Sequence, residues 1–354
     1  MRKLRAGIIG CGGIANGKYL PAMKRNGNFE IVAFCDSMEE KAQKAKTEYG
    51  TKDAKVYTDY TELLKEDVEA VYVLTPNNSH APISIAALEA GKHVMCEKPM
   101  AKSYAEAKAM ADTAERMGRI LTIGYQNRYR ADSEYLKKVC KAGGLGEIYY
   151  AKAHAVRRRA VPTWGVFLDE EKQGGGPLID IGTHALDLTL WMMDNYEPEM
   201  VVGSVYRKLA DQTQAGNAWG DWNPSAFTVE DSAFGFIRMK NGATIQLEAS
   251  WALNTLDVGE AQTVLCGTKA GADMMDGLRI NRISHGRQCV EKPDFAAGGN
   301  GKEEKAVDVE QRVFYNAIVE GKPLVVEPGQ AMTVTRILEA VYESARTGKA
   351  IYLS

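Results

Sequence analysis

The chain has 354 residues, more than a single hydrophobic core usually serves, so two domains are expected. Its 44 basic and 46 acidic side chains nearly cancel, which leaves no net field to attract nucleic acid or an anionic membrane surface. No apolar stretch suits a signal peptide or a membrane span, and the six scattered cysteines contain no C-x-x-C pair, so we expect a cytoplasmic protein with reduced, buried thiols that binds small ligands.

The first predicted elements are a strand, a glycine-rich turn and a helix. An apolar run at residues 4–10 ends in GCGGIA, where Gly10, Gly12 and Ala15 fit the G-x-G-x-x-A form of the dinucleotide fingerprint. A helix is predicted over residues 18–25, and the next strand ends in Asp36. Gly10 would make the tight turn and Gly12 would let the backbone approach a pyrophosphate, whose charge the helix N-terminus attracts.

Asp36 bears on the choice of cofactor. Its carboxylate would accept hydrogen bonds from ribose hydroxyls and repel a 2′-phosphate, and the next residues, Ser37 and Met38, bring no cation to neutralise one. We therefore predict NAD rather than NADP, although Lys41 could compensate. The plainer alternative is a structural glycine turn with Asp36 as a helix cap.

Strands and helices then alternate, which predicts a parallel sheet covered by helices on both faces. The strands are expected at residues 70–74, 93–96 and 120–124, and capping boxes at residues 37–40 and 103–106 predict two of the helices. Ligands bind beyond the carboxyl ends of such strands, where the loops 75–80 and 97–99 lie. Lys98 stands in the second loop, directly after a buried strand; a solvated surface lysine is the alternative interpretation.

The pattern changes near Gly124, where we place the domain border. Strands are predicted at residues 147–157, 200–209, 232–239, 243–251 and 262–266 and around 278–283, and Asn241-Gly242 is a strong hairpin signal. Two glycine-rich loops, 210–225 and 294–302, and two closing helices, 304–320 and 328–346, complete the chain. The second half is thus expected to be a largely antiparallel sheet with few helices, and because broad sheets often dimerise through one face, a homodimer or homotetramer is expected.

One predicted helix within residues 174–195 is apolar nearly all round yet carries a polar line. Asp180, His184 and Asp187 are spaced i, i+4 and i+7, so they share one face of an otherwise buried helix. The entry through GGGP suggests close approach of another body to the backbone. Satisfied core polar residues are the ordinary alternative, but three in line favour chemistry, with Asp180 and His184 reacting and Asp187 supporting them.

Taken together, the motifs GIIGCGGIA, AFCDS, TPNNSH, CEKP and GGGPLIDIGTHALD resemble those of the Gfo/Idh/MocA oxidoreductase family over nearly the whole chain. The resemblance implies an α/β protein with an N-terminal Rossmann domain, residues 1–124. Residues 125–354 would form a C-terminal α+β domain with a large, mostly antiparallel open sheet, and its last helix could pack back on the first domain. The active site would lie between the domains.

Candidate site residues follow from these motifs. The family's lysine, aspartate and histidine fall on Lys98, Asp180 and His184, which are the predicted catalytic residues. The predicted NAD contacts are Gly10, Gly12, Gly13, Ile14, Asp36, Ser37, Thr75, Pro76, Asn77, His80, Glu97, Lys98 and Gln126. The predicted substrate contacts, besides Asp180 and His184, are Arg128, Tyr129, Arg157, Arg158, Trp164 and Trp222, because arginine binds hydroxyl groups and indole stacks on sugar rings.

The resemblance implies reversible hydride transfer between nicotinamide and a secondary alcohol or ketone of a sugar, glycoside or cyclitol. His184 would move the hydroxyl proton, Asp180 would bind substrate or orient the imidazole, and Lys98 would stabilise developing alkoxide charge. The arginine triplet at residues 157–159 leaves phosphorylated substrates open. Two alternatives remain: transient sugar oxidation by a tightly bound NAD, and a sensor or regulator without turnover. No metal is expected, because His80, His93, His154, His184 and His285 lack ligand spacing.

Overall fold

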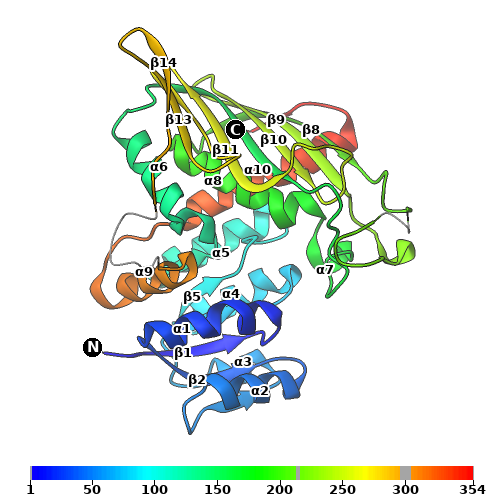
Figure 1. Ribbon diagram of the computed structural model, residues 1–354. Coiled ribbons are helices and arrows are strands. Elements are labelled where there is room, and N and C mark those ends of the chain that lie inside the picture. Colours follow the sequence, from blue (N-terminus) through cyan, green and yellow to red (C-terminus); the bar gives the residue numbers. More distant parts are fainter. Residues whose placement is uncertain (1, 213–215, 296–303, 354) are drawn as a thin grey trace. The chain divides into compact units, whose positions relative to one another are not determined.

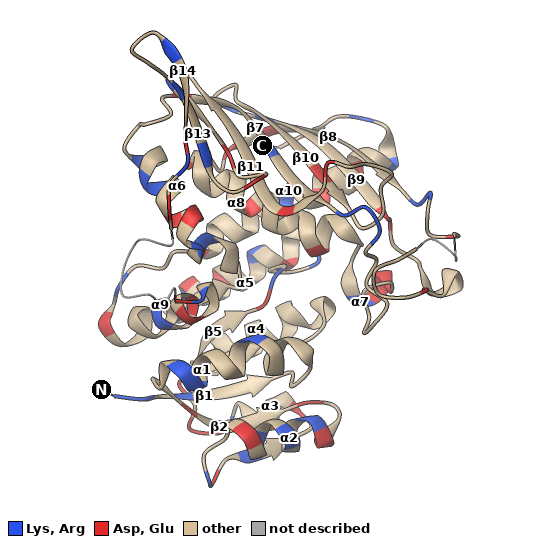
Figure 2. Cartoon of the chain, viewed as in Figure 1, with Lys and Arg blue, Asp and Glu red and all other residues tan. Residues whose placement is uncertain are grey.

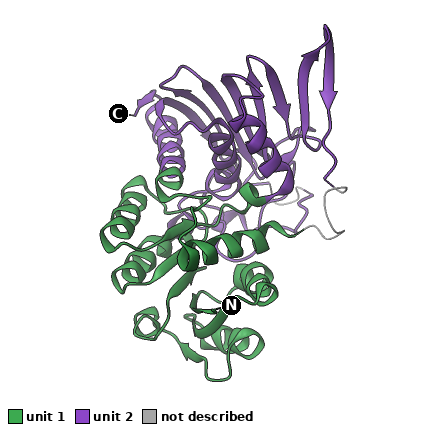
Figure 3. Cartoon of the chain, turned by 90° about the vertical axis from the view of Figure 1, so that its left-hand side faces the viewer, with its two compact units in different colours: residues 1–129, 304–332 green, residues 130–303, 333–354 purple. Residues whose placement is uncertain are grey.

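A computed structural model describes residues 2–212, 216–295 and 304–353 and divides the chain into two compact units. The first contains residues 1–129 and 304–332, and the second contains residues 130–303 and 333–354 (Figure 3). The first border thus follows Tyr129, five residues beyond the expected border at Gly124, and the chain returns to the first unit near its end. Basic and acidic residues are interspersed in each unit (Figure 2).

The first unit is built on a parallel sheet with the strand order β3-β2-β1-β4-β5-β6 among the described residues. This order is that of the doubly wound dinucleotide-binding fold. In it, successive strands are added first on one side of β1 and then, starting with β4, on the other side. The prediction of a Rossmann sheet is confirmed. The strands are β1 (Leu4–Ile9), β2 (Phe29–Cys35), β3 (Lys55–Tyr57), β4 (Ala70–Val73), β5 (His93–Cys96) and β6 (Leu121–Ile123).

Helices cover this sheet because each connection between parallel strands must cross over. Their bounds are η1 (Ala15–Tyr19), α1 (Leu20–Asn26), α2 (Glu39–Tyr49), α3 (Tyr60–Leu63), η2 (Asn77–Ser79), α4 (His80–Glu89), α5 (Tyr104–Met117), η3 (Gln126–Tyr129) and α9 (Ala306–Glu320). α9 belongs here because Phe314 packs edge-on against Tyr72, and Tyr315 packs against Phe29. The penultimate helix is therefore part of the first unit, together with the first turn of the last helix, α10 (Pro328–Thr347).

The two predicted capping boxes have different outcomes. The hydroxyl of Ser103 accepts a hydrogen bond from the backbone N–H of Glu106 at 3.3 Å, so the cap of α5 is confirmed. The box at Ser37 is wrong, because α2 begins at Glu39 and Met38 occupies the cap position. The Asp36 carboxylate accepts the N–H of Met38 at 2.9 Å instead, and this bond shifts the helix start by one residue.

The second unit is built on a sheet with the order β14-β13-β12-β11-β7-β10-β9-β8-β15 among the described residues. Every neighbouring pair is antiparallel except β7 with β10, so the expected mostly antiparallel sheet is confirmed. The strands are β7 (Ile148–Val156), β8 (Pro198–Tyr206), β9 (Ser232–Met239), β10 (Thr244–Ser250), β11 (Gly259–Gly267), β12 (Ala270–Asp273), β13 (Arg279–Ser284), β14 (Arg287–Glu291) and β15 (Ile351–Tyr352).

The longer helices of the second unit lie on one face of its sheet (Figure 1). Val341 of α10 packs closely on β8 and β9: a Cβ at Gly203 would lie 2.7 Å from the Val341 carbonyl oxygen, and one at Gly235 would lie 3.2 Å from its side chain. Thr189 of α8 donates a 2.9 Å hydrogen bond to Thr263 of β11. The helices are α6 (Ala131–Lys141), α7 (Glu170–Gln173), η4 (Leu178–Gly182), α8 (Thr183–Met193), η5 (Pro224–Ala226) and α10 (Pro328–Thr347), whose first turn belongs to the first unit.

The opposite sheet face exposes Val202, Tyr206 and Phe236. That this protein forms a homo-oligomer stays a prediction. The cysteines are free, as expected, but Cys289 is exposed and Cys140 and Cys266 are half-buried, which corrects the expectation that they are buried. Among the described residues, no helix combines the length and apolarity that a bilayer crossing requires. The predicted glycine-rich loop at 294–302 lies mostly outside those residues.

Candidate active site

The fingerprint turn joins β1 to the first helix. Gly10 has φ +93°, and a Cβ there would lie 2.5 Å from the carbonyl oxygen of Leu74, so only glycine fits. Helical structure begins at Gly13, and side chains added at Gly12 or Gly13 would meet no atom within 4 Å. The helix N-terminus therefore faces open space that a pyrophosphate fits. Ile14, also a predicted cofactor contact, is 42% exposed beside it.

Asp36 directly follows β2, next to this turn. One carboxylate oxygen accepts the N–H of Cys11 at 2.8 Å and the other accepts the N–H of Met38 at 2.9 Å. These bonds fix the carboxylate while leaving each oxygen a lone pair for a ribose hydroxyl. Within the described chain Asp36 forms no ion pair, and Lys41 does not neutralise it. The arrangement fits an NAD ribose and opposes a 2′-phosphate.

Buried His80 joins the loops after β4 and β5, which carry several predicted cofactor contacts. Its Nδ1 lies 2.8 Å from the carbonyl oxygen of Pro99, and its Nε2 lies 2.9 Å from that of Thr75. Burial lowers the pKa of the imidazole despite both carbonyls. His80 therefore acts from inside the protein, holding the Thr75 and Lys98–Pro99 loops together, and does not reach the surface as a cofactor contact would.

Glu97 is the centre of a polar cluster that the sequence did not reveal. Its Oε1 accepts hydrogen bonds from Lys18 at 2.7 Å and from the Tyr19 hydroxyl at 2.9 Å, and Lys18 also binds the side chain of Gln126. Burial would raise the pKa of Glu97, but the charges of Lys18 and Lys98 lower it to about 2. Gln126 and Glu97, both predicted cofactor contacts, are thus linked by Lys18, which no sequence signal singled out.

Asp180 and His184 occupy a special position in the second unit. Every residue of 175–192 is buried except these two, and Asp187 is only 1% exposed. The helix starts as the π-helical segment η4 and continues as α8, so the polar line is not straight. The structure therefore brings Asp180 and His184 to the surface of this helix and leaves Asp187 inside. No sequence signal predicted the π-helical turn.

The glycines before this helix accommodate the protein's own residues. Buried Glu230 accepts the N–H groups of Gly176 at 2.8 Å and Leu178 at 3.1 Å, and the Tyr342 hydroxyl at 2.9 Å. A Cβ at Gly175 would overlap Tyr342, and one at Gly176 would overlap the Glu230 carbonyl oxygen. The close approach to the glycine backbone that the sequence predicted is therefore made by other residues of the same chain. Burial raises the pKa of Glu230 to about 7, although these hydrogen bonds oppose the shift.

Trp251, directly after β10, connects Asp180 to a cluster of aromatic rings. Its indole N–H donates to Oδ2 of Asp180 at 3.1 Å, and its ring packs against Phe167 and Phe227. Trp164 contacts both Phe167 and Trp219, with ring centroids 5.9 Å and 4.9 Å apart. We call these five rings the aromatic cluster: Phe167, Phe227, Trp164, Trp219 and Trp251. Trp164 and Trp219 are 51% and 42% exposed, so two indoles of the cluster are open to a ligand.

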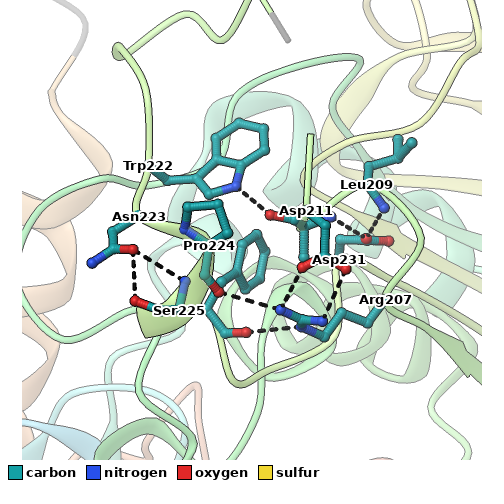
Figure 4. Close-up of polar contacts among 10 residues, drawn as sticks. Arg207, Leu209, Asp211, Trp222, Asn223, Pro224, Ser225 and Asp231 are labelled. Atoms are coloured by element: carbon teal, nitrogen blue, oxygen red, sulfur yellow. Dashed lines mark hydrogen bonds and ion pairs between the residues drawn. The ribbon is translucent and has the colours of Figure 1, made fainter. Parts of the chain in front are cut away.

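Three predicted substrate contacts are buried and need correction. Arg128 is fully buried and donates to the Val325 carbonyl at 2.8 Å and to Gln330, and its neighbour Tyr129 is 4% exposed. The indole of Trp222 donates to the Ala210 carbonyl at 2.6 Å inside the loop that Arg207 and Asp231 also hold (Figure 4). These three side chains therefore have structural roles, because their apolar surfaces and their hydrogen-bond donors are in contact with other residues of the protein.

The arginine triplet is only partly available. Arg157 forms a two-point ion pair with Glu260, at 2.6 and 2.8 Å, and lies 5.0 Å from the centre of the Trp219 ring. Arg159 donates to the side chain of Asn254 at 2.9 Å. Arg158 is exposed, and within the described chain its guanidinium has no hydrogen-bond or ion-pair partner. One of the three guanidinium groups is therefore free for a ligand.

Comparison with known proteins gives two family matches. Residues 4–125 match the NAD-binding Rossmann fold of an oxidoreductase family, and residues 133–273 match the GFO/IDH/MocA C-terminal domain. The chain is also 36% identical to D-glucoside 3-dehydrogenase of Escherichia coli K12, over 99% of this chain and 97% of that protein. The chain belongs to the Gfo/Idh/MocA family.

Solved structures of similar fold agree with this membership. Aldose-aldose oxidoreductase from Caulobacter crescentus superposes with a TM-score of 0.81 at 25% identity, over 99% of this chain and 100% of that one. A levoglucosan dehydrogenase in complex with NADH has a TM-score of 0.83 over the full length of both chains; at 22% identity this likeness concerns the fold.

The family membership tests several predictions about activity and cofactor. As a Gfo/Idh/MocA protein, the chain is an NAD-dependent sugar oxidoreductase that acts on CH–OH groups, with a Rossmann domain for its cofactor. A regulator without turnover is not supported, because a relative that matches nearly the whole chain is a dehydrogenase. The open space at Gly12 and Gly13 and the oriented Asp36 carboxylate are the features of this Rossmann unit that suit a dinucleotide.

Proposed function

We propose that this protein is an NAD-dependent dehydrogenase that oxidises the 3-hydroxyl of an unphosphorylated D-glucoside and reduces the corresponding ketone. The observation that carries the proposal is the hydrogen bond between Trp251 and Asp180, which joins a carboxylate to an aromatic cluster with two exposed indoles. Apolar ring faces pack against indoles, while hydroxyl groups bind carboxylates. The position of oxidation follows a relative that matches nearly the whole chain, a D-glucoside 3-dehydrogenase.

An unphosphorylated substrate is favoured by the state of the arginines. Arginine binds phosphate through charge-assisted hydrogen bonds, which are strongest when two are made at once. The charge of Arg157 is already paired with Glu260, and Arg159 is hydrogen-bonded to the neutral side chain of Asn254. Separating Arg157 from its carboxylate partner would cost the two-point ion pair, so a neutral glucoside fits these surroundings better than a sugar phosphate.

The protein's own residues would supply proton transfer and charge stabilisation. Bound NAD supplies the hydride acceptor, held by the turn at Gly10–Gly13 and by Asp36. His184 takes the proton of the reacting hydroxyl in oxidation and returns it in reduction. Asp180, fixed by Trp251, accepts a hydrogen bond from the substrate, and Lys98 stabilises negative charge that develops on the carbinol oxygen.

Steady-state absorbance at the NADH band tests the proposal. We expect turnover with methyl glucosides and NAD, weaker activity with glucose 6-phosphate, and a 3-keto product by NMR. His184→Ala and Lys98→Ala should each lower kcat by roughly two to four powers of ten while NAD affinity stays within a few-fold. Normal turnover by either variant contradicts the assigned roles, and oxidation at another carbon contradicts the proposed position.

The same measurement separates exchangeable from tightly bound cofactor. Catalytic accumulation of NADH is expected for a dehydrogenase. A single stoichiometric rise in absorbance that reverses on adding a second sugar would instead indicate a cofactor that stays bound through a cycle of oxidation and reduction, and would overturn the proposed release of NADH.

A further inference from the structure

His154 lies in the second unit, in the centre of the nine-stranded sheet and apart from the residues discussed above. It belongs to β7, and Glu248 lies beside it in register on β10. The imidazole is 1% exposed, and its Nδ1 is 2.8 Å from Oε2 of Glu248. Because a carboxylate accepts hydrogen bonds, Nδ1 carries the proton and donates it to Glu248. In the neutral ring, the other nitrogen, Nε2, carries the lone pair.

Nε2 has no hydrogen-bond partner among the described residues, although it is buried. The nearest charged atom on its other side is Oδ1 of Asp257, 4.0 Å away. When the ring is neutral, Nε2 and Oδ1 are both electron-pair donors, and a cation between them would satisfy both. Ligand atoms of His154, Glu248 and Asp257 all lie within 4.8 Å of one another; neighbouring ligand atoms of a tetrahedral zinc ion are about 3.3 Å apart, so the exposed Asp257 side chain would move inward to bind one.

The ammonium group of Lys152 supplies one cation to this cluster. Its Nζ lies 2.9 Å from Glu248 and 3.3 Å from Asp257. Hydrogen bonds from His154 and Lys152 lower the pKa of Glu248, so the carboxylate is ionised at neutral pH. Among the described residues, the ammonium contacts the two carboxylates and not Nε2, which has no partner. A divalent ion can bind Nε2 and the Asp257 carboxylate at once.

We propose that His154 and Asp257, with Glu248 orienting the imidazole, form a site for one Zn²⁺ ion. Nε2 of His154 and the Asp257 carboxylate bind the metal, while Glu248 accepts the hydrogen bond from Nδ1–H and holds the ring in place. Imidazole with carboxylate ligands suits zinc better than magnesium or calcium, which prefer oxygen alone, and water would complete the coordination. A carboxylate that fixes the far nitrogen of a metal-bound histidine is a recurring arrangement.

Lys152 is the competitor of the metal in this site. Its side chain is long, flexible and 21% exposed, so the ammonium can move into water when zinc arrives. The Asp257 side chain is 60% exposed and can approach the ion from outside. Bound zinc would tie the segment between β10 and β11, which carries Asp257, to the buried part of the sheet.

Isothermal titration with Zn²⁺ alone, on full-length, tag-free, EDTA-treated protein, tests the site. A Cys289→Ser background removes the exposed thiol, which could bind zinc independently. We expect one ion per chain and a rise in Tm with zinc. His154→Ala and Asp257→Asn should each weaken binding by about 100-fold, and Glu248→Gln by about 10- to 100-fold. His285→Ala, at an exposed histidine without this cluster, should bind as the parent does.

Lys152→Met distinguishes a metal site from an internal ion-pair network. Removal of a competing cation should strengthen zinc binding about tenfold or more, whereas a network that merely needs the ammonium gives no gain in affinity. The proposal is overturned if the parent binds no stoichiometric zinc below millimolar concentration, if Asp257→Asn binds equally well, or if Lys152→Met does not tighten binding. Asp257 is largely exposed, so its variant keeps the test valid should His154→Ala fail to fold.

Discussion

The indole N–H of Trp251 donates a 3.1 Å hydrogen bond to the carboxylate of Asp180, 71 residues away along the chain. Trp251 is the residue that directly follows β10, and Asp180 lies in the π-helical segment η4. The bond orients one of the two helix residues of 175–192 that are not buried. It thereby connects the aromatic cluster, a feature suited to sugar binding, with the carboxylate proposed to hold the substrate.

Trp251→Phe keeps an aromatic ring but removes the donor. Because a hydrogen bond to a charged group contributes roughly 1.5–3 kcal/mol, we expect kcat/KM for the glucoside to fall by about tenfold or more. Tm should fall by a few degrees, because the smaller phenyl ring leaves part of the space of a fully buried indole empty, although contacts with Phe167 and Phe227 remain. Trp222→Phe is the matched control, because it removes the N–H of another buried indole, which binds the Ala210 carbonyl and does not touch Asp180. An unchanged kcat/KM in Trp251→Phe would contradict the role of the hydrogen bond.

Asp36→Asn keeps the shape of the side chain but removes its charge. Since Asp36 has no neutralising ion pair in the described chain, the charge itself should discriminate against the 2′-phosphate. We expect KM for NAD to rise and the ratio of kcat/KM for NADP to that for NAD to increase by roughly one power of ten. Asp53→Asn, at an exposed acid, should leave the ratio as in the wild type. A constant ratio in Asp36→Asn would show that Asp36 does not select the cofactor.

Gly176→Ala tests the packing of the glycine entry. The new Cβ would overlap the carbonyl oxygen of Glu230, a backbone atom that cannot move aside cheaply. Strain and a disturbed Glu230 network should lower the free energy of unfolding by about 2–4 kcal/mol, measured by urea denaturation. In Gly329→Ala the Cβ meets nothing within 4 Å, so a neutral or slightly stabilising effect is expected there. Equal stability of the two variants would refute the close approach.

The stability of the second unit should depend on the protonation of Glu230. Its pKa, raised by burial to about 7, exceeds the ordinary 4.5 of an unfolded chain, so the folded state binds a proton more tightly. The contribution of Glu230 to stability is therefore complete below pH 4.5 and is lost as pH rises through 7.

Glu230→Gln removes that titration while keeping the side-chain size. We expect the free energy of unfolding of the wild type, relative to the variant, to fall by about 1–3 kcal/mol between pH 5 and pH 8. Glu310→Gln is a control in the first unit, where burial also raises a carboxyl pKa to about 7, and it reports changes outside the second unit. A pH-independent difference between wild type and Glu230→Gln would contradict the shift.

Much of the fold could be predicted because local patterns determine it. The glycines, the strand ending in Asp36 and the alternation of strands and helices are short-range features, and they produced the Rossmann sheet with element ends mostly within three residues. Asn241-Gly242 marked the β9–β10 turn for the same reason, since Gly242 has φ +87° there. The return of α9 to the first unit was missed because it depends on aromatic packing between Phe314 and Tyr72.

The candidate site, like the fold, has features that local sequence patterns determine and features that depend on tertiary contacts. By itself, the sequence determined that Asp180 and His184 share a helix and that Gly10, Gly12 and Asp36 form a dinucleotide fingerprint, because helical period and turn chemistry are local. Only the tertiary structure decided that Asp187 and Arg128 are buried, that Trp251 orients Asp180, and that His154 meets Glu248 and Asp257. Spacing could not reveal such contacts, since strand pairing and burial bring together side chains that are distant in the chain.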